Sequence, residues 1–197
     1  MAQIIGILKY YYCYKSNTLS FNAFRYTYTK ENTMKINEKR QCKGGGIMVW
    51  GMVTPNGILT IKRLHGKIKS QNYLDMLKNF AVVIMKLNMR PHFSFVQDNC
   101  TIHKTKEVQN YLQSQNIRLI DWPSRSPDLN IIENMWKVMS DLVYDAGQPK
   151  NLKELEQRLF EAANTINNDK RHVINNLYNG FRHRLTSVLR CQGGVFK

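Results

Sequence analysis

The sequence is poor in acidic residues, and none of its aspartates comes before Asp75. Its 14 acidic side chains stand against 29 lysines and arginines, which gives a formal net charge of +15. The excess is spread along the chain, at +6 for residues 1–46, +5 for residues 47–150 and +4 for residues 151–197. A surplus of this size favours a polyanionic partner, above all nucleic acid, over a basic protein without such a partner.

The sequence also lacks a membrane-spanning run, a secretory signal and a paired-cysteine motif. No apolar run approaches the ~20 residues that a membrane span needs. The first residues lack a basic segment and a small-residue cleavage site, so we expect no secretory signal. The four cysteines (Cys13, Cys42, Cys100 and Cys191) form no C-x-x-C pair. Only Cys100 and His103 have ligand-like Cys/His spacing, and one such pair does not make a zinc site. We expect reduced thiols in an intracellular protein.

The apolar pattern from residue 47 onward predicts a mixed α/β sheet. A turn at Thr54–Gly57 joins two strands, residues 47–53 and 58–61, into an antiparallel hairpin. The segments that follow are a helix from Ser70, a strand at 93–97, a helix containing Val108, Tyr111 and Leu112, a short strand at 117–120, and a helix from Asn130 to about Tyr144. This order indicates one sheet with helices on its faces.

The two ends of the chain carry weaker signals. Residues 4–8 and 19–28 have the composition of strands, and the polar, basic residues 30–43 indicate a long hairpin connection or a loop. Tyrosines near residues 10–14 alternate with lysines, a pattern compatible with base stacking but more typical of ordinary sheet. Asn151 with Glu154 predicts the start of an amphipathic helix, and we expect the basic tail from Lys170 to be helical too.

Two carboxylates are the candidate functional residues, and each has a structural alternative. Asp98 ends an apolar strand, where ligands bind in open α/β sheets, although turns also favour aspartate there. Glu133 lies in the first turn of a helix, where a capping box with Asn130 would account for it. Trp136 is better explained as core, and His103 as a surface or loop histidine.

Three blocks of the sequence together closely resemble the Tc1/mariner transposases. They are Gly44–Trp50, Gln97-Asp98-Asn99 with His103, and the run from Asp121-Trp122-Pro123 through Ser126-Pro127-Asp128-Leu129-Asn130 to Glu133 and Trp136. The 34 residues between Asp98 and Glu133 match the DD34E spacing of that family. The resemblance implies a ribonuclease H-like α/β fold. It divides the chain into a poorly defined segment 1–24, a Tc1-like DDE domain 25–148 and a helical basic extension 149–197.

By this resemblance, Asp98 and Glu133 are the second and third catalytic carboxylates. They would hold Mg²⁺ or Mn²⁺ in a two-metal site that cleaves and transfers DNA strands in transposition and integration. The implied partner is DNA, either transposon ends or target DNA, contacted mainly through its backbone. We further expect a nuclear location, a homodimer and no membrane association.

The chain departs from the family pattern at the first catalytic aspartate, which belongs on a strand before the glycine run. Only Glu31 and Glu38 are acidic there, both in a polar stretch, and Asn22 is a weak candidate for the position. The sequence also lacks a counterpart of the family's DNA-reading helix-turn-helix. We therefore expect a truncated or decayed catalytic domain whose activity is impaired. The alternative is an inactive transposon-derived module that binds nucleic acid.

Overall fold

The computed structural model describes residues 4–13, 26–28, 34–36, 46–88, 93–123, 126 and 129–190, and for the first three ranges it describes the backbone alone. The strands are β1 (Ile4–Cys13), β2 (Tyr26–Tyr28), β3 (Met34–Ile36), β4 (Gly46–Thr54), β5 (Ile58–Leu64), β6 (Ser94–Gln97) and β7 (Arg118–Leu119). The helices are α1 (Ser70–Met76), a π-helical segment η1 (Leu77–Ala81), α2 (Val82–Asn88), the 3₁₀ turn η2 (Thr101–His103), α3 (Lys106–Ser114), α4 (Ile131–Tyr144), α5 (Leu152–Asn168), α6 (Arg171–Asn179) and α7 (Phe181–Arg190).

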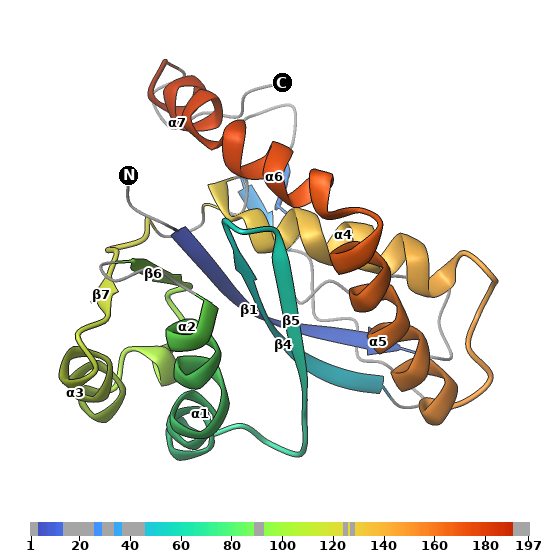
Figure 1. Ribbon diagram of the computed structural model, residues 1–197, viewed down its shortest axis with the longest axis horizontal. Helices are drawn as coiled ribbons and strands as arrows, with labels where there is room; N and C mark the ends of the chain where they lie inside the picture. Colours follow the sequence, from blue (N-terminus) through green and yellow to red (C-terminus); the bar gives the residue numbers. More distant parts are fainter. Residues whose placement is uncertain are drawn as a thin grey trace.

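Five strands form one mixed sheet in the order β5-β4-β1-β6-β7 (Figure 1). β4 pairs antiparallel with both β5 and β1, and β6 pairs parallel with both β1 and β7. Strand β1 is therefore central, so the sheet extends upstream of the predicted domain boundary at residue 25. The apolar composition predicts a strand over residues 4–8, and the strand continues to Cys13 because β4 pairs antiparallel with it from Gly6 to Cys13.

Strand β4 separates two hydrophobic cores because successive side chains point to opposite faces of a sheet. Ile47, Val49 and Val53 belong to one core, while Trp50 and Met52 belong to the other. The first core contains side chains of α4, α5 and α6, and the second contains side chains of α1, η1, α2 and α3. Figure 1 shows the two groups of helices on opposite sides of the sheet. The predicted arrangement of a sheet between helices is confirmed.

The C-terminal helices are part of the same packing unit as the sheet. Leu155, Leu159 and Ile166 of α5 and Ile174 of α6 are all buried in the core that α4 lines. The hydroxyl of Tyr178 donates a hydrogen bond to the Val53 carbonyl oxygen at 3.0 Å. The extension predicted over residues 149–197 is thus helical through Arg190 and packs directly on the sheet domain.

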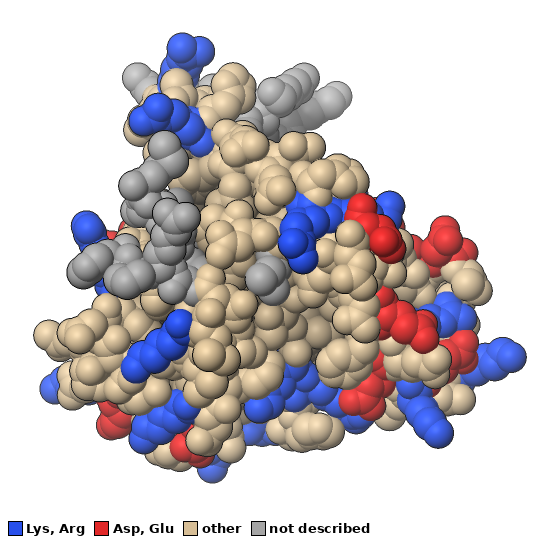
Figure 2. All heavy atoms as spheres, viewed as in Figure 1, with Lys and Arg blue, Asp and Glu red and all other residues tan. Residues whose placement is uncertain are grey.

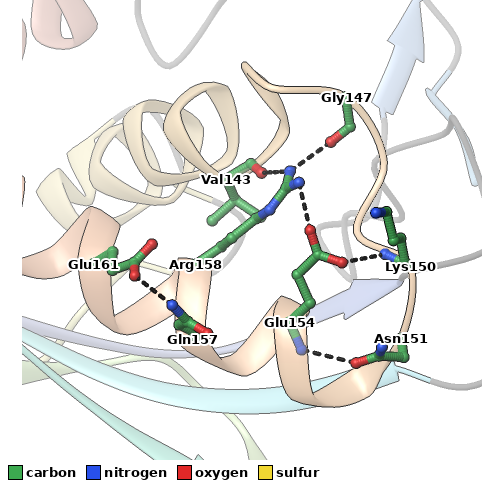
Figure 3. A network of polar contacts seen from close by, with 8 residues as sticks. All are labelled: Val143, Gly147, Lys150, Asn151, Glu154, Gln157, Arg158 and Glu161. Carbon is green, nitrogen blue, oxygen red and sulfur yellow. Dashed lines mark hydrogen bonds and ion pairs between the residues drawn. The ribbon is translucent and has the colours of Figure 1, made fainter.

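A polar network ties the end of α4 to the start of α5 (Figure 3). The guanidinium of Arg158 donates to the carbonyl oxygens of Val143, at 3.1 Å, and Gly147, at 2.7 Å, and lies 2.7 Å from the Glu154 carboxylate. Asn151 caps α5 by accepting from the Glu154 N–H at 2.9 Å, as predicted. The Glu154 carboxylate accepts from the N–H of Lys150, one residue before the cap, and this bond and Arg158 lower its pKa.

One local prediction needs correction. The prediction of a hairpin connection or loop over residues 30–43 is wrong at Met34–Ile36, which form β3 because they pair antiparallel with β2. The expected strand at 19–28 is described only at Tyr26–Tyr28, and the rest of it lies outside the described residues. Helix α1 begins at Ser70, as predicted, and its N-cap is Lys69, whose N–H is accepted by the Asn72 side chain.

Acidic and basic side chains are mixed over one edge of the molecule, whereas the tip of α7 is basic alone. Acidic side chains gather along the edge formed by α5, which carries Glu154, Glu156 and Glu161 (Figure 2). The tip formed by α7 is basic, with Arg182, Arg184 and Arg190 and no acidic residue. None of the helices in the described ranges has both the length and the hydropathy of a membrane span.

Candidate functional site

Asp98 follows the last residue of β6, a strand whose four residues are all buried. Its side chain is 34% exposed, so the carboxylate stands at the edge of the core and reaches solvent. One oxygen, Oδ1, accepts a hydrogen bond from the Cys100 N–H at 3.2 Å and lies 2.6 Å from Nδ1 of His103. The carboxylate is therefore held by the turn that follows its own strand.

The turn after Asp98 is anchored to the core beneath it. Gln97 accepts from the Tyr73 hydroxyl at 3.0 Å and donates to the His103 carbonyl oxygen at 3.1 Å. The ring of Tyr73 lies against the imidazole with centroids 4.2 Å apart, and His103 is only 2% exposed. The prediction of a surface or loop histidine is wrong, because η2 folds the chain back and buries this ring.

Glu133 is half-buried in the first turn of α4. Burial, and then the nearby negative charge of Asp98, raise the pKa of Glu133 to about 7. An electrostatic effect of one carboxylate on another requires them to be close, since water screens distant charges. The structure thus brings together two carboxylates that 34 intervening residues separate in the sequence.

The capping explanation for Glu133 fails. Asn130 is the N-cap of α4, but its side chain makes no capping hydrogen bond, and its Oδ1 is buried without a hydrogen-bond partner. Between these residues there is a backbone bond, from the Glu133 N–H to the Asn130 carbonyl oxygen at 3.1 Å. No capping box therefore accounts for the Glu133 carboxylate.

The strand beside Asp98 carries no acidic residue. In the parallel pairing of β1 with β6, Ile7 is opposite Gln97, so Leu8 is the next β1 residue in register, beside Asp98. The sequence of β1 is IIGILKYYYC, which places an apolar residue and then Lys9 where a third carboxylate would complete the cluster. Asn22, Glu31 and Glu38 lie outside the described residues, as does Asp128.

A second loop borders the site and connects it to the basic helix α7. Asn99 donates to the carbonyl oxygen of Trp122 at 2.8 Å. The indole of Trp122 stacks on Phe181, the first residue of α7, with ring centroids 6.4 Å apart. The prediction that Trp136 belongs to the core is confirmed, since it is fully buried.

Oxygen, nitrogen and sulfur donors are available to a cation at this place. Asp98 and Glu133 supply hard carboxylate oxygens, and Cys100 and His103 have ligand atoms within 4.8 Å of each other and of an Asp98 oxygen. Burial is the main cause of the raised pKa of Glu133, and a cation between the two carboxylates would relieve the second cause, the repulsion by Asp98. Sequence reasoning missed the contact of His103 with Asp98, although a histidine five residues after a strand-end aspartate was a signal for it.

Comparison with known proteins gives consistent matches. The family model described as DDE superfamily endonuclease matches residues 19–156. The Tc3 transposase of Caenorhabditis elegans is 33% identical over 159 residues, which is 80% of this chain and 47% of that protein. The Tc1 transposase of the same species is 32% identical over 108 residues, 52% of this chain and 40% of that protein. The chain thus spans less than half the length of these relatives.

Solved structures of the Mos1 transposase have the same fold. The crystal structure of its catalytic domain superimposes with a TM-score of 0.73 at 11% identity, covering 98% of this chain and 84% of that one. A Mos1 paired-end complex with the left transposon end gives a TM-score of 0.75 at 13% identity, covering 98% of this chain and 56% of that one. Likeness at this identity is evidence of fold alone, and it confirms the predicted ribonuclease H-like class.

Proposed function

Because the chain belongs to the DDE superfamily endonucleases, as a Tc1/mariner transposase catalytic domain, we propose that it cleaves and transfers DNA strands in transposition and integration. Asp98 and Glu133 are the catalytic carboxylates of this proposal. One observation carries it: the fold places Glu133 close enough to Asp98 for the Asp98 charge to raise its pKa. Two carboxylates at the edge of a sheet, without a salt-bridge partner for Glu133 among the described residues, are poorly explained by stability.

The resident ion in this proposal is Mg²⁺ or Mn²⁺, held by the oxygens of Asp98 and Glu133. DDE enzymes use divalent metal, and Mos1 catalytic-domain structures have been solved with Mg and with Mn. Carboxylate oxygens are the ligands that both ions prefer. Bound ions would supply the positive charge that activates the attacking hydroxyl and stabilises the leaving oxygen at phosphorus. The protein's own part is to keep both carboxylates in place, Asp98 through the Cys100 N–H and Glu133 through the first turn of α4.

DNA is the substrate and partner in this proposal, and basic side chains bind its phosphates. Lys104 and Lys106 are exposed just after the turn that holds Asp98. Arg182 is exposed on α7, whose first residue stacks on the site-bordering Trp122. Cations placed around the carboxylates can bind the backbone on either side of a scissile phosphate, with little choice of sequence.

Activity should be weaker than in a domain with three carboxylates. The β1 residues beside Asp98 supply no negative charge, so the pair can anchor a first ion better than a second. This same feature favours the second candidate function, an inactive module that binds DNA through its basic surface. We propose a homodimer and a nuclear location with either function.

Nicking of supercoiled plasmid with Mg²⁺ or Mn²⁺ tests the proposal. The chain is compared with Asp98→Asn and Glu133→Gln, which remove charge and keep shape, and with Glu161→Gln, an exposed acid on α5. We expect metal-dependent nicking that both site variants lose and the control retains. Absence of nicking, or nicking that survives both site substitutions, would favour the binding module.

A further inference from the structure

Three side chains of different ligand chemistry converge in the turn after β6. Asp98, Cys100 and His103 each offer a ligand atom, and these atoms all lie within 4.8 Å of one another. The convergence is produced by η2, where the His103 N–H bonds to the Cys100 carbonyl oxygen at 2.9 Å and folds the chain back. Glu133 is not a member of this group of three.

The imidazole of His103 is the strongest indication of a ligand. Its Nδ1 is buried and lies 2.6 Å from Asp98 Oδ1, but the pair does not have the angles of a hydrogen bond. The ring cannot readily turn away, because Tyr73 packs on its face and Gln97 holds its carbonyl oxygen. A ring nitrogen fixed in this way is suited to donate its lone pair to a metal ion.

The donor set selects the kind of metal. An imidazole nitrogen, a carboxylate oxygen and a thiolate sulfur are ligands of Zn²⁺ and similar transition ions, whereas Mg²⁺ takes oxygen ligands. We propose that Asp98, Cys100 and His103 form a site for a transition metal ion of the Zn²⁺ class. Three protein ligands leave a fourth position for water, as in zinc sites that are open to solvent.

The geometry needs little adjustment to accept the ion. At Zn–N and Zn–O bonds of about 2.1 Å, two ligands at the tetrahedral angle stand about 3.4 Å apart. His103 Nδ1 and Asp98 Oδ1 now lie 2.6 Å apart, so they must separate by less than about 1 Å. Cys100 is exposed and Asp98 is 34% exposed, which gives the ion a path from solvent. Binding converts the Cys100 thiol to a thiolate and releases its proton to water.

The site shares Asp98 with the Asp98–Glu133 pair, so a Zn²⁺-class ion and Mg²⁺ would compete for that carboxylate. The inference does not rest on DNA cleavage, because Cys100 and His103 are not part of the proposed catalytic pair. The sequence shows the Cys100/His103 pair, and the fold adds Asp98 as a third ligand.

Cobalt titration tests the site, since Co²⁺ replaces Zn²⁺ and its absorption reports both thiolate ligation and tetrahedral geometry. The test uses a variant with the substitutions Cys13→Ser, Cys42→Ser and Cys191→Ser, so that Cys100 is its single thiol. We expect one equivalent of Co²⁺ to give the thiolate-to-cobalt charge-transfer band, and Zn²⁺ to bleach it. Cys100→Ser should abolish the band, and His103→Gln should weaken Co²⁺ binding at least about 10-fold.

Glu133→Gln is the matched control. It should leave the cobalt band unchanged while abolishing nicking, which separates the two sites even if one of the proposals fails. Because His103 is buried and its replacement can unfold the turn, Cys100→Ser at the exposed position is the deciding variant, with folding checked by circular dichroism. A single-thiol protein that binds no Co²⁺, or binds it without a thiolate band, would overturn the proposal.

Discussion

Gly51 of β4 lies directly beneath the indole of Trp136, the large buried side chain of α4. A β-carbon at position 51 would stand 2.7 Å from Trp136 Cζ2, which is closer than β-carbons come to other heavy atoms in proteins. The glycine lets the helix that carries Glu133 pack against the strand next to β1. This contact sets how near α4, and with it Glu133, comes to the sheet edge where Asp98 lies.

Replacing Gly51 with alanine should therefore destabilise the protein by about 1–3 kcal/mol, the usual cost of overpacking a core. Chemical denaturation measures the free energy of unfolding. Gly180→Ala is the control, because Gly180 has a helical φ of −75° and its β-carbon would lie no closer than 3.2 Å to any atom outside its own turn. Equal effects of the two substitutions would contradict the close contact.

Arg158→Met should lower the unfolding temperature, because it leaves the part-buried Val143 carbonyl oxygen, the Gly147 carbonyl oxygen and the Glu154 carboxylate without their shared donor (Figure 3). Glu161→Ala, which removes an exposed hydrogen bond with Gln157 on the same helix, should change stability by no more than about 0.5 kcal/mol. Thermal unfolding of both variants checks this difference. A harmless Arg158 substitution would mean that the network does not hold α4 to α5.

The raised pKa of Glu133 predicts a pH dependence of stability. Its pKa is about 7 in the folded chain against an ordinary 4.5, so the folded state binds the proton more tightly. The stability this gives is fully present below pH 4.5 and is lost as the pH rises through 7. Between pH 5 and pH 8 the free energy of unfolding of the metal-free protein should fall by about 2–3 kcal/mol more than that of the Glu133→Gln variant.

Denaturant titrations in chelator at the two pH values measure this loss. Glu161→Gln, an exposed carboxylate, should follow the unmodified chain. A Glu133→Gln protein with the same pH slope as the unmodified chain would show that Glu133 is not buried beside Asp98.

The register of β1 predicts where a third carboxylate would restore activity. Leu8 follows the residue paired with Gln97, so Leu8→Asp places a carboxylate beside Asp98. Metal-dependent nicking should rise at least about 10-fold, since a charged ligand is added to an incomplete site. Lys9→Asp, one residue out of phase on the strand, is the control. An equal gain from both substitutions would point to a general effect of charge.

Much of the sheet could be predicted from local patterns. The hairpin of β4 and β5 follows from two apolar runs around Pro55-Asn56-Gly57, and α4 begins where Asn130 predicts it. The central position of β1 could not be predicted, because it depends on long-range pairing with β4 and β6, to which composition gives no clue. The π-helical segment at Leu77–Ala81 had no signal either, since it keeps the apolar spacing of the helix around it.

The candidate site divides in the same way. Asp98 and Glu133 were found from motif and spacing, and their roles stay predictions. The burial of His103, its contact with Asp98, and the missing capping bond of Asn130 arise from how η2 and α4 pack. Spacing gives the order of residues along the chain, whereas tertiary packing decides which of them meet.

Mn²⁺ binding followed by electron paramagnetic resonance tests the central claim most directly, that Asp98 and Glu133 act together as a metal-holding pair. The unmodified chain should bind Mn²⁺, and Asp98→Asn and Glu133→Gln should each weaken binding at least about 10-fold, while Glu161→Gln leaves it unchanged. If Glu133→Gln bound Mn²⁺ as tightly as the unmodified chain, the two carboxylates would not form one site, and the account would be contradicted.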